Sequence, residues 1–376
     1  MKSVGDDLPT VTWTETGHAC SAGWHSEWAV PPLNVAIADD RTTADVAYRL
    51  ACEGTAMLWR GDFQNGRQLL KAMARRVDRR PPKAGSSVSE SFYFRRESQS
   101  HRARILGMLL IGLDETYRIR LRRAPDVRQA CEEAYGPPLR PTLVSLRELL
   151  GLVGAHEWRK KGILIRALGD RIYPHYGVFS PIRGEYVELV AQQPLSRCAV
   201  AFDIGTGTGV LAAVLAKRGV PRLIATDRDP RAVACARDNF TRLGFINRVE
   251  VLLADLFPQG KAQLVVCNPP WIPALATSSI EQSVYDPENR MLYGFLTGLA
   301  AHLEPGGEGW LLLSNLAEHL ELRTREELLS VIEQAGLVVL GKSDIRPSHP
   351  RANDQADALY AARAAEVTSL YRLGTQ

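Results

Sequence analysis

The sequence has little of what marks secreted, membrane-spanning or metal-binding proteins. Only 6 of its 376 residues are cysteines, and none of them forms a Cys-x-x-Cys pair. We therefore expect free thiols in a reducing compartment, and neither disulfides nor a metal site. The longest apolar runs, such as residues 105–113, are far shorter than the roughly 20 residues that a membrane-spanning helix needs. No apolar stretch follows the acidic start of the chain, so the sequence shows no signal peptide and predicts a cytoplasmic protein.

Positive charge is not spread evenly along the chain. The formal net charge is +4, but residues 66–130 hold 16 Lys and Arg against 6 Asp and Glu. Such an excess favours contact with an anionic partner, for example RNA, and it is equally typical of a solvated, arginine-rich helix surface. Both interpretations stay open at this point.

The length and the pattern of elements divide the chain into two predicted domains. Residues 1–160 begin with an irregular, tryptophan-containing segment of loops or short strands and continue with helical periodicity, so we expect a mainly helical recognition domain. The helices expected there cover residues 43–59, 64–77, 125–134 and 143–152.

In residues 161–376, strand-like and helical stretches alternate. This alternation predicts an α/β domain with a Rossmann-like, seven-stranded and mostly parallel sheet that helices cover on both faces. The expected strands are Ala199–Asp203, Arg222–Asp227, Val249–Leu253, Leu264–Asn268, Trp310–Ser314, Val338–Leu340 and Thr368–Leu373.

A glycine-rich turn follows the first of these strands. Gly205, Gly207 and Gly209 alternate with other residues, so the backbone can turn tightly and admit a ligand against bare main chain. Asp203 comes before the glycines. Its carboxylate would repel the pyrophosphate of a dinucleotide but suits the ammonium group of an amino acid. This difference favours S-adenosylmethionine over NAD as the cofactor.

Two more carboxylates are expected at the same edge of the sheet, because ligands of an open parallel sheet lie beyond the carboxyl ends of its strands. Asp227 follows the second strand, where a carboxylate can accept both hydroxyls of a ribose. Asp255 and Leu256 follow the third strand and can meet the amino group and the ring of an adenine, with an exposed loop carboxylate as the alternative for Asp255. Thr206 and Arg228, which stand beside these residues, are assigned to the same cofactor pocket.

The tetrapeptide Asn268-Pro269-Pro270-Trp271 ends the fourth strand. Its prolines leave the Pro269 carbonyl free of sheet pairing, so this oxygen and the Asn268 side-chain oxygen can both accept hydrogen bonds from one planar amino group. Trp271 offers a ring face for stacking the substrate. A nitrogen held in this way next to a sulfonium methyl needs mainly positioning for transfer. The tetrapeptide therefore predicts N-methyl transfer, with Asn268 bordering the cofactor as well; a simple turn is the weaker interpretation.

Together these residues resemble the class I S-adenosylmethionine-dependent methyltransferases. Within that class they look most like the HemK-type enzymes, which methylate a glutamine amide of peptide release factors. Residues 178–187 are similar to the segment that those enzymes carry before the glycine motif, and Tyr285-Asp286-Pro287-Glu288 looks like their segment after the catalytic motif. The resemblance covers about residues 172–345. It implies that Glu185 and Tyr186 border the cofactor pocket.

Two features depart from this family. Trp271 stands where the family usually has Tyr or Phe, and residues 1–160 do not look like the small helical domain that docks release factors. The same catalytic motif also serves enzymes that methylate exocyclic amines of adenine or guanine. We therefore expect a protein glutamine as the acceptor, with an RNA or DNA base as the alternative. A non-catalytic binding module is the remaining class of function.

Other polar residues are weaker candidates. His349, with Asp354 and Asp357 nearby, can line the site, although a histidine before a proline in a loop is more often incidental. Exposed helix faces are the expected positions of His302, Glu318 and His319.

Overall fold

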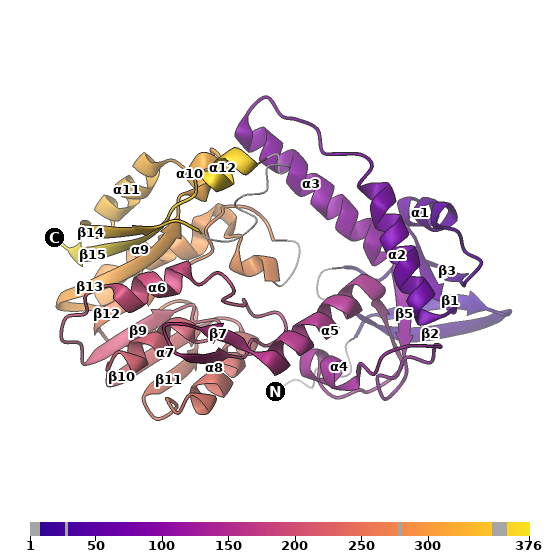
Figure 1. Cartoon of the computed structure of the whole chain (residues 1–376), viewed down its shortest axis with the longest axis horizontal. Helices are drawn as coiled ribbons and strands as arrows, with labels where there is room; N and C mark the ends of the chain where they lie inside the picture. Colours follow the sequence, from indigo (N-terminus) through magenta and orange to yellow (C-terminus); the bar gives the residue numbers. More distant parts are fainter. Residues whose placement is uncertain (1–7, 27–28, 277–279, 348–358) are drawn as a thin grey trace. The chain divides into compact units, whose positions relative to one another are not determined.

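The computed structural model describes residues 8–26, 29–276, 280–347 and 359–376. It divides the chain into two compact units. The N-terminal unit combines residues 1–85 with residues 93–157, and the C-terminal unit combines residues 86–92 with residues 158–376. Figure 1 shows the elements of both units. The predicted functional boundary near residue 160 stays a prediction.

The C-terminal unit is built around a seven-stranded mixed sheet. Five neighbouring strands run parallel, and the last two join them in antiparallel pairs. In spatial order the strands are β11 (Val249–Leu253), β10 (Arg222–Asp227), β9 (Val200–Ile204), β12 (Ala262–Cys267), β13 (Leu303–Ser314), β15 (Thr368–Thr375) and β14 (Leu337–Ile345). The central strands are short apolar runs because helices cover both of their faces.

Two groups of helices cover this sheet. One face packs against α6 (Glu185–Gln192), α7 (Val210–Lys217) and α8 (Pro230–Arg242), whose apolar side chains share a core with the sheet. The other face packs against α9 (Arg290–His302) and α11 (Arg325–Gln334). The remaining elements of the unit are the hairpin β7 (Ile163–Ile165) and β8 (Asp170–Ile172), the short helices α10 (Leu316–His319) and α12 (Tyr360–Ala364), and the 3-10 turns η1 (Ile280–Ser283) and η2 (Pro287–Asn289).

The N-terminal unit contains a six-stranded sheet. Its strands β3, β4 and β5 run parallel to one another, whereas β1 and β2 form an antiparallel hairpin. Because β1 also lies beside β3, the sheet is nearly closed. In spatial order the strands are β1 (Thr10–Glu15), β2 (His18–His25), β6 (Thr142–Ser145), β5 (Leu109–Leu113), β4 (Thr55–Trp59) and β3 (Asn34–Ala38). Between these strands the chain forms α1 (Ala44–Cys52), α2 (Phe63–Val77), α3 (Val88–Gly107) and α4 (Arg128–Tyr135), and α5 (Leu146–Lys161) follows β6. The first residues of α3 and the last residues of α5 belong to the C-terminal unit.

The prediction of a mainly helical N-terminal domain is therefore wrong. The helix expected over residues 43–59 ends at Cys52, and the chain turns through Gly54, whose φ is +83°. The next residues form strand β4, which is buried on both faces and so lacks the alternation that marks a half-exposed strand. Short buried strands of this kind cannot be told from helix segments by periodicity alone.

The expected helix over residues 143–152 shows the same confusion, since its first residues belong to β6 and only the rest to α5. In the parts of the chain that the structure describes, no helix is long and apolar enough to cross a membrane.

Candidate active site

A cavity of about 540 Å³ lies in the C-terminal unit, beyond the carboxyl ends of β9, β10, β11 and β12. The turns that follow these four strands supply much of its lining. Of the residues predicted from the sequence, those that line it are Asp203, Gly205, Thr206, Gly207, Asp227, Arg228, Asp255, Leu256, Asn268, Pro269, Pro270 and Trp271. The fold thus brings to one cavity turns that are up to 68 positions apart in the sequence (Asp203 to Trp271).

The glycine turn between β9 and α7 has a left-handed backbone, with φ of +69° at Gly205, +55° at Gly207 and +82° at Gly209. Only glycine adopts such angles without strain. Gly209 does not line the cavity, and a Cβ atom there would lie 2.6 Å from Cζ of Phe240. Gly207 instead has open space around the position of a Cβ atom. The turn therefore presents bare main chain to the cavity at Gly207, while Gly209 lets α8 pack closely.

Asp203 is fully buried beneath this turn. Its Oδ2 accepts hydrogen bonds from the Thr206 hydroxyl (2.6 Å) and from the Ala212 backbone N–H (3.1 Å). Oδ1 has no hydrogen-bond partner among the described residues. Burial raises the pKa of the Asp203 carboxyl to about 6, because the charged form loses its hydration. A cation placed in the cavity would restore the ionised form.

Asp227, at the end of β10, ties the glycine turn to the neighbouring strand. Its Oδ2 accepts from the Gly207 N–H and its Oδ1 from the Asp229 N–H, both at 2.9 Å. Burial raises the pKa of this carboxyl as well. The two backbone N–H groups hold the carboxylate in a fixed orientation, and each oxygen keeps a lone pair for a ligand.

Asp255 and Leu256 follow β11 and differ sharply in environment. Asp255 is more than half exposed and forms an ion pair with Arg290 (2.6 Å). Leu256 has a φ of +72°, which is uncommon for a residue other than glycine. Its carbonyl accepts a hydrogen bond from the Thr226 hydroxyl (2.6 Å), and this contact helps to fix the turn. An apolar side chain is thereby held at the cavity wall beside an exposed carboxylate.

Asn268 and Trp271 are joined by a hydrogen bond that the sequence did not predict. The indole Nε1–H of Trp271 donates to Oδ1 of Asn268 at 2.9 Å. Because an indole N–H can only donate, this bond identifies the amide atom that faces Trp271 as the oxygen. A carbonyl-type oxygen has two lone pairs, so one remains for a second donor. The signal in the sequence was the tryptophan itself, which stands three positions after the asparagine.

Arg183 lines the cavity, although the sequence analysis gave it no role. Its guanidinium lies 5.7 Å from the centre of the Trp271 ring and donates to Glu185 (2.8 Å) and to Glu366 (3.1 Å). The Ser314 hydroxyl donates to the same Glu366 oxygen (2.8 Å). Two buried carboxylates thus hold one arginine against the indole. Glu366 is 183 positions away in the sequence, so no local pattern could reveal it.

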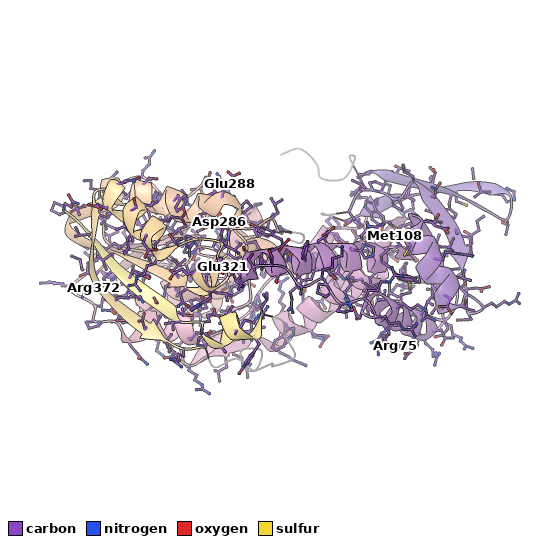
Figure 2. The ribbon with its side chains drawn as sticks, turned by 90° about the horizontal axis from the view of Figure 1, so that it is seen from above. Arg75, Met108, Asp286, Glu288, Glu321 and Arg372 are labelled. Carbon is purple, nitrogen blue, oxygen red and sulfur yellow. The ribbon has the colours of Figure 1, made fainter. Side chains whose placement is uncertain are left out.

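The segment after the tetrapeptide also reaches the cavity. Asp286, labelled in Figure 2, lines it and accepts hydrogen bonds from the backbone N–H groups of Met291 and Leu292, which begin α9. Burial raises the pKa of the Asp286 carboxyl. Tyr186 also lines the cavity. Glu185 does not line it but accepts a hydrogen bond from Arg183, which does.

The weaker candidates do not join this cavity. The ring of His302 stacks on Phe257 (4.2 Å between ring centres) near the end of α9, and the Glu318–His319 pair lies in α10. None of these three lines the cavity. His349, Asp354 and Asp357 lie outside the described residues.

Comparison with known proteins finds relatives that share part of this chain. The model of the family described as Ribosomal protein L11 methyltransferase (PrmA) matches residues 187–281. The chain is 36% identical over 136 residues to the release factor glutamine methyltransferase of Cereibacter sphaeroides, covering 32% of this chain and 48% of that protein. The release factor glutamine methyltransferase of Mycolicibacterium smegmatis is 41% identical over 135 residues, covering 33% of this chain and 46% of that protein.

A third relative acts on another kind of acceptor by its name. The tRNA1(Val) (adenine(37)-N6)-methyltransferase of Parabacteroides distasonis is 29% identical over 168 residues, covering 43% of this chain and 68% of that protein. The chain spans about half the length of the two glutamine methyltransferases (48% and 46%). The C-terminal unit is a class I S-adenosylmethionine-dependent methyltransferase domain, and the family resemblance predicted from the motifs is confirmed at this level.

Proposed function

We propose that the chain transfers a methyl group from S-adenosylmethionine to a planar amide nitrogen, and that this nitrogen belongs to a glutamine side chain of a protein. The observation that carries the proposal is the position of Asn268-Pro269-Pro270-Trp271, which lines the same cavity as Asp203 and Asp227. The cofactor residues and the amine-binding residues therefore line one cavity.

The cofactor half of the proposal assigns a charge or a hydrogen-bonding group to each part of S-adenosylmethionine. The free oxygen of Asp203 suits the ammonium group at its amino-acid end, and the oriented carboxylate of Asp227 suits the two ribose hydroxyls. Leu256 covers one side of the adenine, and Asp255 lies at its edge. When bound, the sulfonium supplies the methyl group.

The acceptor half assigns one planar nitrogen to two oxygens. Asn268 Oδ1 has one remaining lone pair, and the Pro269 carbonyl has no hydrogen-bond partner among the described residues. These two oxygens accept hydrogen bonds from the two N–H groups of the acceptor nitrogen. This contact would hold the nitrogen in one orientation. Bound S-adenosylmethionine would supply the methyl group and leave as a neutral thioether, and the acceptor nitrogen would give up one proton to solvent.

A protein glutamine is favoured by the two relatives that are named release factor glutamine methyltransferases. An exocyclic amine of a nucleic-acid base is the second candidate. It is favoured by the tRNA adenine methyltransferase relative and by the 16 Lys and Arg against 6 Asp and Glu in residues 66–130.

Transfer of a labelled methyl group into cell extract tests the choice. The purified chain and labelled S-adenosylmethionine are incubated with extract, which is then separated into protein, RNA and DNA. We expect the label in the protein fraction, where protease treatment releases it and nuclease treatment does not. Label in RNA would replace the glutamine proposal by the base proposal. Binding of S-adenosylmethionine without transfer to any fraction would favour a binding module.

A further inference from the structure

The N-terminal unit contains a second cavity, of about 210 Å³, that the methyl-transfer proposal does not use. It lies at one end of the nearly closed six-stranded sheet, beyond the carboxyl ends of the parallel strands β4 and β5. Such strand ends and the mouths of closed sheets are recurrent positions of ligand sites. Its lining includes Trp13, Arg60, Gly112, Arg118 and Arg120.

The inner face of the sheet changes from apolar to cationic at this end. Val11, Leu58 and Leu110 belong to the core inside the sheet, and Trp13 packs against that core. Because side chains alternate along a strand, Arg60 and Gly112 continue the face of Leu58 and Leu110 toward the cavity. A Cβ atom at Gly112 would lie 3.8 Å from both Arg60 Nη1 and Leu143 Cδ2, which is ordinary contact. Any longer side chain there would enter the cavity.

Glu15 holds the Arg60 guanidinium in one orientation and leaves one of its nitrogens available to a ligand. Its Nε donates to Glu15 Oε1 (2.8 Å) and its Nη2 to Glu15 Oε2 (2.6 Å). In the described part of the chain, Nη1 has no partner. A bidentate carboxylate pair of this kind fixes the plane of the guanidinium.

Arg118 and Arg120 stand on a rigid turn. Asp114 Oδ1 accepts from the Arg118 N–H (2.9 Å), and Asp114 Oδ2 accepts from Arg120 Nε (3.0 Å). Tyr117, which comes directly before Arg118, is buried with a φ of +58°. The Arg118 guanidinium forms no hydrogen bond or ion pair with any described residue. Arg60 pairs with Glu15, and Arg120 pairs with Asp114 and, at 3.7 Å, with Glu115. Among the described residues, the Arg118 guanidinium therefore has no carboxylate partner.

We propose that this cavity binds a phosphate group between the guanidinium groups of Arg60 and Arg118, with Trp13 as its apolar wall. Guanidinium edges match phosphate oxygens in pairs, and Arg60 Nη1 and the Arg118 guanidinium, which have no partner among the described residues, supply such donors at one cavity. The phosphate can come from a nucleic-acid strand or from a free phosphate compound. The proposal is independent of the methyl acceptor.

Titration of the full-length chain at low salt tests it, with inorganic phosphate and a short single-stranded oligouridylate as separate probes. We expect saturable binding of at least one probe, weakened about tenfold or more by Arg118→Gln, which removes a charge-assisted contact, and also by Gly112→Leu, which fills the cavity. The matched control is Arg75→Gln on α2 (Figure 2): Arg75 is exposed, lies outside the cavity and gives the same change in net charge.

Binding of the oligouridylate alone identifies a nucleic-acid phosphate, and saturable binding of inorganic phosphate identifies a site for free phosphate. Equal weakening by Arg118→Gln and Arg75→Gln would overturn the proposal, since net charge alone would then explain binding. So would the absence of saturable binding of both probes. Unchanged thermal unfolding of every variant shows that the N-terminal unit has kept its fold. Unchanged binding of S-adenosylmethionine, which the C-terminal unit holds in our proposal, separates this test from the proposed methyl transfer.

Discussion

Trp271 gives the clearest residue-scale prediction, because its N–H and its ring can be separated. Trp271→Phe keeps an aromatic face but removes the hydrogen bond to Asn268 Oδ1. A neutral hydrogen bond contributes about 0.5–1.5 kcal/mol, so we expect kcat to fall up to about tenfold through a less fixed amide. The affinity for S-adenosylmethionine should not change, and calorimetry checks this. An unaltered kcat would show that the indole N–H does not position Asn268.

Asp203 gives a second residue-scale prediction, in the form of a pH profile. Burial raises the pKa of this carboxyl to about 6, so below that pH it is neutral and cannot pair with the ammonium group of the cofactor. We therefore expect the Kd for S-adenosylmethionine to rise as the pH falls through 6, by about tenfold per pH unit.

The variant Asp203→Asn supplies the control, because an amide keeps an oxygen for Thr206 but does not titrate. Its affinity should be low at every pH. If its pH profile keeps the slope of the original chain, the titrating group is a different one.

At the scale of elements, a buried histidine joins α4 to the N-terminal sheet. His25 of β2 stacks on Tyr135 of α4, with 4.1 Å between the ring centres. Burial, with a smaller contribution from Arg140, lowers the pKa of His25 from 6.5 to about 4. The folded state therefore binds the proton less well than the unfolded state does.

The stability that depends on neutral His25 is complete above pH 6.5 and is lost as the pH falls from 6.5 toward 4. With these pKa values, linkage gives a loss of about 2 kcal/mol at pH 5. His25→Phe keeps the stacked ring without a titrating group. Urea denaturation at pH 7.5 and pH 5 should show a smaller drop in unfolding free energy for this variant. An equal drop in both chains would assign the pH dependence to other groups.

At the scale of the whole molecule, the sequence predicted the elements of the C-terminal unit better than those of the N-terminal unit. The elements of the C-terminal unit are regular because most of its short apolar strands are followed by a longer helix, and this helix is amphipathic in the case of β10 and α8. In the N-terminal unit β4 comes directly after α1 and a two-residue turn, with no change in apolar content to mark it. Periodicity alone could not separate the two.

The candidate site shows the same division between local and distant information. Most of the cavity-lining residues named in the sequence analysis lie at the ends of strands or in the turns that follow them, where motif spacing is informative. The Arg183–Glu366 pair could not be predicted, because it joins a loop before α6 to a residue near the end of the chain. The Trp271–Asn268 hydrogen bond lies between the two cases, since its partners are close in sequence but their geometry depends on the turn.

The central claim is that one cavity holds the cofactor through Asp203 and Asp227 and the acceptor nitrogen through Asn268. The Asn268→Ala variant tests it most directly, when S-adenosylmethionine affinity and methyl transfer to the labelled fraction are measured on the same preparation. The account predicts cofactor affinity within a few-fold of the original chain and transfer reduced by about a hundredfold or more, the typical cost of removing an oriented group at a reacting centre. Loss of cofactor binding, or transfer that continues at the original rate, would contradict it.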